Sequence, residues 1–202
     1  YGESHGPGLG GVLDGCPPGI ELTPEMIQAD LDRRKPGGGK ASTARKEPDL
    51  VNIYSGVFED RTTGTPIGFH IANKDQRSRD YSQVKDVYRP GHADITFDAK
   101  YGFRDYRGGG RSSGRETACR VAGGAIAAQV LAVRGISVAA YTTELGGIAA
   151  GSPDLDGVLE RDYFAAEPGV IEAWDARVDE VVSQGDSIGG VVEILATGVP
   201  AG

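Results

Sequence analysis

The segment YRGGGRSSGRETACRVAGGAIAAQVLAVRG, residues 106–135, constrains the fold more than any other part of the chain. Its second half repeats apolar residues at helical spacing from Ala118 to Ala132, and Gly135 follows as a C-terminal stop. Most of that face is alanine, and the Gly-Gly pair at 123–124 leaves even less side chain. The segment therefore predicts a helix over residues 115–134 against which a neighbouring element packs closely.

Three glycines and two serines directly precede this helix, and four arginines fall between residues 106 and 120. Glycine is costly to order, and clustered arginines repel one another unless an anion lies among them. Ser112 and Ser113 lie where a helix N-terminus offers N–H groups and a positive dipole, and Arg111 adds a planar set of donors. The stretch predicts a site for phosphate or for ring oxygens, although its spacing is not that of an ATP-binding loop. The alternative is a flexible turn with Ser113 as helix cap and solvated arginines.

Other local patterns predict further helices and strands. Thr23 followed by Pro24 marks a helix start, and the helix is expected to end near Lys35, before Pro36. Strands are expected at residues 9–13, 51–57, 66–73, 136–145 and 189–202, and an acidic amphipathic helix at 168–183. Strands and helices do not alternate strictly, so the expected fold class is α+β.

Residues 74–110 are polar, turn-rich and without periodicity, which predicts a long loop. The loop contains aromatic residues at six positions, which favours an ordered conformation: Tyr81, Tyr88, Phe97, Tyr101, Phe103 and Tyr106.

The formal net charge of −8 is unevenly distributed. Residues 147–193 carry eleven acidic residues against two arginines, a net charge of −9, so the remainder sums to +1. Basic residues cluster in that remainder at Arg33, Arg34, Lys35, Lys40, Arg45 and Lys46, and at Arg89, Lys100, Arg104, Arg107, Arg111, Arg115 and Arg120. Overall acidity argues against a nucleic-acid partner. Two local basic clusters favour a small, multiply anionic ligand, with a solvated basic face as the alternative.

The histidines and cysteines indicate which kinds of chemistry the chain could carry out. His5 and His92 lie in glycine-bracketed loops, where an imidazole can exchange protons near neutral pH, whereas His70 falls in an apolar strand and is expected to be structural. No spacing typical of metal ligands occurs, so no metal site is predicted. Cys16 and Cys119 are expected to be free thiols, and no apolar run reaches the length of about 18 residues that spans a membrane. The first residue is Tyr1 and the only methionine is Met26, so we expect residues upstream.

Six segments together closely resemble the chorismate synthase family: GESHG, DLDRRKPG, RKEPD, SGVFEDRTTGTPI, DYSQVKDVYRPGHADITFDAKYGFRDYRGGGRSSGRETACRVAGGAIA and DSIGGVVEILATGVPAG. The resemblance implies a β-α-β sandwich, in which two sheets enclose helices, and a single domain over residues 1–202 that is incomplete at both ends. It also implies a carbon–oxygen lyase that converts 5-enolpyruvylshikimate 3-phosphate to chorismate and phosphate by anti-1,4-elimination, in the shikimate pathway of aromatic amino acid biosynthesis. Reduced FMN as cofactor, NADPH as a candidate reductant, a cytoplasmic location and a homotetramer are implied as well.

The resemblance assigns roles to particular residues. By similarity His5 and His92 are catalytic, with His5 expected to act toward the departing phosphate and His92 toward the flavin. Arg111, Ser112 and Ser113 match the FMN-binding segment, Arg34 and Lys40 fall where basic residues face the nicotinamide or the substrate phosphate, and Arg45 and Arg107 are expected to bind substrate. Position 40 is commonly Arg in the family, so Lys40 keeps the charge and loses the bidentate geometry.

The chain also departs from the family in length. The family continues well beyond GVPAG, with further flavin-contacting residues and an acidic residue proposed to remove the C6 proton, and it has a short strand before GESHG. The alternative function is therefore a catalytically incomplete fragment that binds flavin or anions and self-associates through exposed sheet edges.

Overall fold

The computed structural model describes residues 1–35, 47–74 and 85–201, and its contacts divide the chain into two compact units. Unit 1 holds the described residues from Tyr1 to Val133, and unit 2 those from Arg134 onward. Both units combine helices with antiparallel strands, so the predicted α+β class is confirmed. Of the helices in these described ranges, none combines the length and apolarity that crossing a membrane requires.

Unit 1 is built on a three-stranded antiparallel sheet with the order β1-β5-β2. Strand β5 (Ile67–Ala72) is central and pairs with β1 (Gly8–Leu13) and with β2 (Val51–Ile53). Alternate residues of β5 are buried, because one face of the sheet packs on helices. The predicted strands at 9–13 and 66–73 are confirmed, and the expected hairpin partner of β5 is β2.

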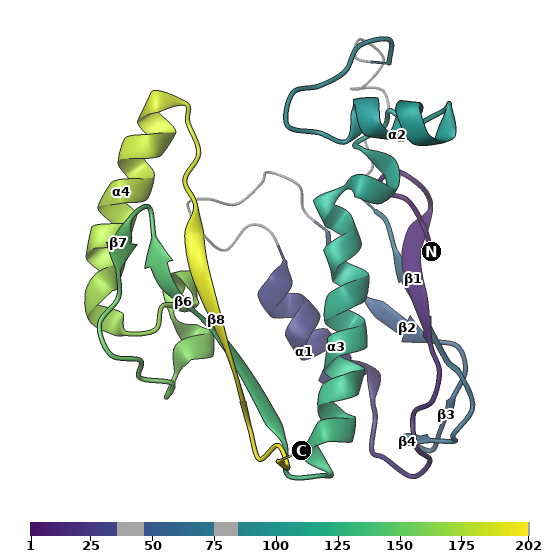
Figure 1. Ribbon diagram of the computed structural model, residues 1–202. Helices are drawn as coiled ribbons and strands as arrows, with labels where there is room; N and C mark the ends of the chain where they lie inside the picture. The colour runs from purple at the N-terminus through teal and green to yellow at the C-terminus, as the bar shows by residue number, and fades with distance from the viewer. Residues whose placement is uncertain (36–46, 75–84, 202) are drawn as a thin grey trace. The chain divides into compact units, whose positions relative to one another are not determined.

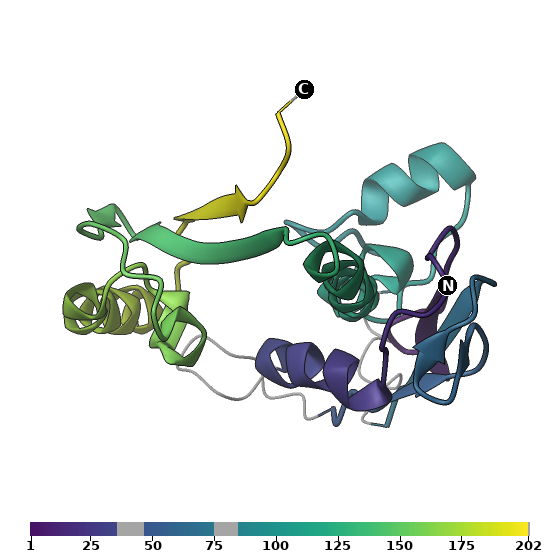
Figure 2. The same ribbon diagram turned by 90° about the horizontal axis from the view of Figure 1, so that it is seen from below.

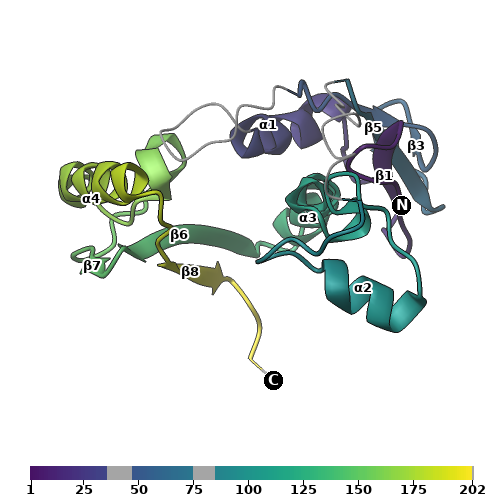
Figure 3. The same cartoon turned by 90° about the horizontal axis from the view of Figure 1, so that it is seen from above.

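Two helices cover that face of the sheet, α1 (Pro24–Arg34) and α3 (Thr117–Ala132), and Figures 1 and 3 show them side by side. The hydroxyl of Thr23 caps α1 by accepting a hydrogen bond from the Met26 N–H at 3.4 Å, as the sequence predicted. The buried face of α3 is Ala118, Ala122, Ala125 and Ile126, and it shares one core with α1 and the sheet. The small side chains let the two helices approach closely.

Two predictions for this unit are wrong in detail. The continuous strand expected at 51–57 is interrupted by Gly56, whose φ of +82° turns the chain into a small hairpin of β3 (Val57–Phe58) and β4 (Arg61–Thr62). The loop expected at 74–110 contains a helix, α2 (Asp94–Tyr101). Its apolar residue Ile95 is exposed, so the helix carries no buried stripe that periodicity could reveal.

Unit 2 is a second antiparallel sheet, ordered β7-β6-β8, with one long helix. Strand β6 (Ser137–Leu145) pairs with β7 (Ile148–Ala149) and with β8 (Gly190–Thr197), which ends before the predicted position 202. Figure 2 shows α4 (Ile171–Gln184) beside β6. The fully buried Trp174 of α4 donates its indole N–H to the carbonyl of Ile148 at 2.9 Å, which fixes the helix to the sheet. All eight residues of β8 are exposed.

Candidate functional site

Two loops that lie far apart in the sequence meet in unit 1. They are the GESHG loop, residues 2–6, also called the histidine loop, and the glycine-rich loop, residues 108–114. His5 is buried, and a β-carbon at Gly108 would lie 2.3 Å from its Cδ2 atom. A β-carbon at Gly110 would lie 3.0 Å from Oε2 of Glu3. Both glycines have positive φ, +60° and +51°, which few other residues adopt. Glycine is therefore required here by conformation and by contact with the histidine loop.

Arg111 joins the same two loops. Its Nη1 donates a hydrogen bond to the carbonyl of Gly2 at 2.7 Å and forms an ion pair with Oε2 of Glu116 at 2.7 Å. The Arg111 side chain is 46% exposed, whereas that of Glu116 is 5% exposed. The guanidinium thus keeps an open side that could face an anionic ligand.

The hydroxyls of Ser112 and Ser113 shape the turn into α3. Ser112 donates to the carbonyl of Gly109 at 2.7 Å, and Ser113 accepts from the N–H of Arg115 at 3.2 Å. Ser113 therefore caps a 3-10 turn, Gly114–Glu116, that leads into the helix at Thr117. The alternative interpretation of Ser113 as a cap is confirmed, although the arginine that follows is buried rather than solvated.

Arg34 lies among three internal acceptors. It donates to Oδ2 of Asp49 at 3.1 Å, to Oγ1 of Thr117 at 3.1 Å and to the carbonyl of Gly114 at 3.2 Å. These bonds tie the end of α1 to the start of α3. The other two basic residues predicted near it, Lys40 and Arg45, lie outside the described residues.

Arg107 and Asp105 form a pair beside the histidine loop. Arg107 Nε and Nη2 contact the two carboxylate oxygens at 2.9 and 2.8 Å, and the Arg107 side chain is 42% exposed. The hydrogen bonds from Arg107 lower the pKa of Asp105, and the nearby His5 charge lowers it further. Asp105 in turn raises the pKa of Arg107. This position therefore offers a fixed cation with one face open to solvent.

His92 is exposed, and its ring Nδ1 lies 3.2 Å from the carbonyl of Pro90, while its backbone N–H donates to the carbonyl of Arg89 at 3.3 Å. The turn that carries it is held by Arg89, whose Nε and Nη2 each contact the carboxylate of Asp94 at 2.9 Å. These hydrogen bonds lower the pKa of Asp94 from 3.8 to about 2. The separate roles predicted for His5 and His92 stay predictions.

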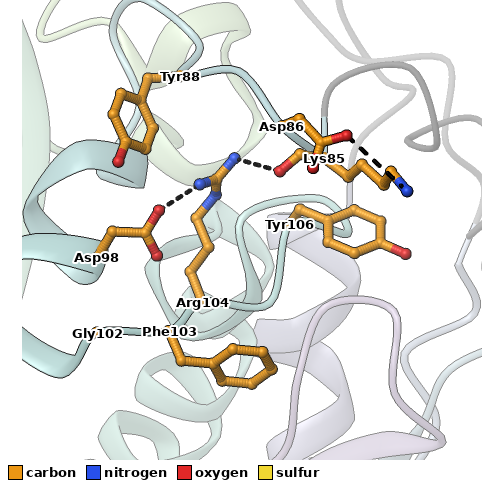
Figure 4. A pocket seen from close by; sticks show the side chains of 8 residues that line it. All are labelled: Lys85, Asp86, Tyr88, Asp98, Gly102, Phe103, Arg104 and Tyr106. Atoms are coloured by element: carbon orange, nitrogen blue, oxygen red, sulfur yellow. Dashed lines mark hydrogen bonds and ion pairs between the residues drawn. The ribbon is translucent and has the colours of Figure 1, made fainter.

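A pocket of about 430 Å³ lies between α2 and the chain ahead of the glycines (Figure 4). Arg104 crosses it, with Nη2 donating to the carbonyls of Lys85 and Val87 at 2.9 and 2.8 Å and Nη1 contacting Asp98. The pocket edge includes Phe103, which is 81% exposed. The sequence placed Arg104 in a basic cluster that favoured an anionic ligand. In the structure its guanidinium bonds to acceptors of the protein itself.

Most arginines of the second basic cluster likewise have internal partners. Arg89, Arg104, Arg107, Arg111 and Arg115 each pair with an acidic side chain of unit 1. Local sequence could not reveal Asp49, which pairs with both Arg34 and Arg115 and is fully buried. The only hint in the sequence is that Asp49 follows the basic residues Arg45 and Lys46 closely. Within the described ranges no group of three or more His, Cys, Asp or Glu side chains is placed to hold a metal ion.

Comparisons with known proteins identify the family. The family model described as chorismate synthase matches residues 1–202. The chorismate synthase of Maridesulfovibrio salexigens is 66% identical over 202 residues, which is all of this chain and 58% of that protein. The chorismate synthase of Oleidesulfovibrio alaskensis is 64% identical, with all of this chain and 57% of that protein covered. The chain thus spans somewhat more than half the length of these relatives.

A crystal structure of a chorismate synthase superposes on the chain with a TM-score of 0.75 and 29% identity, covering 97% of this chain and 56% of that one. The predicted fold type is therefore confirmed together with the sequence resemblance. Because the family model covers every residue and curated relatives match the whole chain at 64–66% identity, the chain belongs to the chorismate synthase family.

Proposed function

We propose that this chain supplies the N-terminal part of the machinery that converts 5-enolpyruvylshikimate 3-phosphate to chorismate and phosphate. The reaction is an anti-1,4-elimination, carried out by a carbon–oxygen lyase acting on a phosphate ester. The observation that carries the proposal is the meeting of the GESHG loop with the glycine-rich loop, in which His5 lies against Gly108 and Arg111 bonds to Gly2. This junction places an imidazole and a half-exposed guanidinium in one part of unit 1.

Reduced FMN is the cofactor that we propose for this site. The half-exposed Arg111 and the bare backbone of the glycine turn ahead of α3 fit an anionic ring and a phosphate, since the helix N-terminus adds a positive dipole. Arg111, Ser112 and Ser113 would hold the flavin, which when bound lends an electron transiently in a reaction without net redox change. Arg34 has internal partners, which favours a supporting role, and Lys40 remains a proposed ligand of the nicotinamide or the substrate phosphate.

The chain's own residues then bind the substrate and move protons. Arg107, fixed by Asp105 and open on one face, would bind a carboxylate or phosphate of the substrate together with Arg45. As the carbon–oxygen bond breaks, the imidazolium of His5 would give a proton to the departing phosphate oxygen. The exposed His92 would exchange a proton on the flavin side. Fixed cations stabilise the negative charge that accumulates in such a site.

The assembly and location belong to the same proposal. A homotetramer in the cytoplasm, with NADPH as a candidate source of electrons for the flavin, is what the family membership supports.

The test is an anaerobic assay with chemically reduced FMN and 5-enolpyruvylshikimate 3-phosphate, following phosphate release and chorismate absorbance. It is run on this chain and on an extended chain that matches the length of the relatives, each with a His92→Ala variant. We expect the extended chain to form chorismate and its His92→Ala variant to lose most of that activity. An extended chain that binds substrate and reduced FMN without forming chorismate would contradict the proposal.

A second candidate is the incomplete fragment that binds flavin or anions without turnover. The observation behind it is that all eight residues of β8, at one edge of the unit 2 sheet, are exposed. The same assay separates the two, because the fragment predicts FMN binding and no product from the 202-residue chain alone.

A further inference from the structure

Unit 1 contains a buried carboxylate, Asp49, whose partners are Arg34 and Arg115 rather than the half-exposed Arg107 and Arg111. Asp49 is fully buried and has a φ of +49°, an uncommon backbone conformation for a residue other than glycine. Its two carboxylate oxygens are divided between two guanidiniums, Oδ2 to Arg34 and Oδ1 to Arg115. A buried charge is tolerated only when it is paired and hydrogen-bonded, so this position is specified by the two arginines.

Arg115, which is held by Asp49, also binds the side chain of Asn73. Both side chains are buried, and Arg115 Nε donates to Oδ1 of Asn73 at 3.1 Å. A guanidinium can only donate, so the oxygen of the Asn73 amide must face Arg115 and the NH₂ group must face the other way. One orientation of the amide is thereby selected.

The NH₂ group of Asn73 holds the histidine loop. It donates to the carbonyls of Glu3, Ser4 and Gly6 at 3.0, 3.2 and 2.8 Å. The backbone N–H of Asn73 also donates to the carbonyl of Pro7 at 3.0 Å. One side chain therefore binds the backbone on both sides of His5.

The same network reaches the glycine-rich loop. Arg115 lies in the 3-10 turn that follows this loop, and the ring of His5 lies against Gly108 within it. The His5 ring is so close to the Gly108 backbone that a β-carbon on Gly108 would overlap it. A shift of the carbonyls of the GESHG loop would therefore press the imidazole against that backbone.

We propose that Asn73, oriented by Arg115 and Asp49, is a positioning residue for His5, an inference that rests on the reaction proposed above. Asn73 touches neither substrate nor cofactor in this proposal. It fixes the direction in which the imidazole of His5 presents its proton, and a displacement of a catalytic group by about 1 Å costs on the order of 100-fold in rate.

The test compares Asn73→Asp with Asn52→Asp, which makes the same change at the chain's other asparagine, an exposed residue of the neighbouring strand β2. Asp at position 73 keeps the volume and the acceptor for Arg115 and places an oxygen against three carbonyls. In the extended chain we expect Asn73→Asp to lower kcat about 100-fold with little change in KM. We expect Asn52→Asp to resemble the wild type.

A second readout does not depend on turnover. The imidazole of His5 is followed by ¹H–¹⁵N NMR across pH in the 202-residue chain, for the wild type, Asn73→Asp and Arg115→Lys. Arg115→Lys keeps the charge beside Asp49 and removes the Nε donor, so it too is expected to shift the His5 pKa and chemical shifts. If Asn73→Asp does not fold, Arg115→Lys decides the matter.

The outcomes separate this inference from the proposed function. His5 signals that are unchanged in a folded Asn73→Asp or Arg115→Lys chain would overturn the positioning role, whatever the activity. A wild-type extended chain that makes no chorismate, while the His5 signals shift as expected, would overturn the proposed function and leave the structural coupling standing.

Discussion

The imidazole of His5 lies directly against the α-carbon of Gly108, 103 positions later in the chain, with no space for a β-carbon between them. The contact joins the GESHG loop and the glycine-rich loop, the two most distinctive stretches of the sequence. It also makes the glycine-rich loop part of the wall that encloses the histidine.

Gly108→Ala is expected to destabilise the chain by about 1–3 kcal/mol, because alanine is strained at a φ of +60° and its methyl group would overlap the His5 ring. Urea denaturation followed by circular dichroism measures the change. Gly114→Ala is the matched control, since nothing lies within 4 Å of a β-carbon there and φ is not positive. Equal stability of the two variants would show that the His5 contact is loose.

Gly124→Ala is expected to have the opposite sign. Gly124 lies within α3, is exposed, and would place its β-carbon in open space. Alanine in a helix interior is favoured over glycine by about 0.5–1 kcal/mol, so the free energy of unfolding of the 202-residue chain should rise by that amount. A fall on the same denaturation curve would mean that another element packs against this position.

Asp94 predicts a pH dependence. Its folded-state pKa of about 2 lies below the ordinary 3.8, so its contribution to stability is present above pH 4 and is lost as pH falls toward 2. The contribution amounts to about 2 kcal/mol at neutral pH and roughly half of that at pH 3. Denaturation of the wild type and Asp94→Asn at pH 7 and pH 3 measures it. Asp86→Asn, at a side chain that is 83% exposed, should show no such change, and a pH-independent difference for Asp94→Asn would refute the assignment.

Arg111→Lys is expected to weaken the binding of reduced FMN about tenfold, because lysine keeps the charge and loses the planar donors that reach Gly2 and Glu116. Isothermal titration under anaerobic conditions gives the dissociation constants. The control is Arg33→Lys on α1, where the arginine pairs with Asp30 one turn away. Unchanged affinity in Arg111→Lys would remove this residue from the proposed flavin site.

His92→Asn is expected to lower turnover of the extended chain by 10²–10⁴, the usual contribution of a general acid or base, without changing stability, because the side chain is exposed. His70→Asn should leave turnover intact, since His70 is stacked between Tyr1 and Tyr54 with ring centroids 6.1 Å apart on each side. Loss of activity in His70→Asn alone would reverse the assigned roles of the two histidines.

Elements with local signals were predictable from the sequence. Thr23 and Pro24 determine the start of α1 by capping chemistry within a few residues, and the alanine face of α3 needs only its own period. Helix α2 was missed because Ile95 faces solvent and Ala93, the residue at its start, makes no side-chain cap. Its order comes from the buried contact of Asp94 with Arg89.

The candidate site was predictable in its residues and less so in their partners. Side-chain types identified His5 and Arg111 as chemically suited, but the carboxylates that neutralise the arginines come from distant positions. Asp49 lies 66 positions from Arg115 and is held there by the packing of unit 1, a relationship that no local pattern records.

The buried network around Asn73 has a consequence for how fast the chain folds and unfolds. Its contacts join residues separated by 66, 42 and 67 to 70 positions, so long segments must be brought together before any of them can form. Such contacts are expected to be absent from the transition state for folding. Weakening them should then accelerate unfolding and leave the folding rate nearly unchanged, so the same bonds that orient His5 would also set the lifetime of the folded chain.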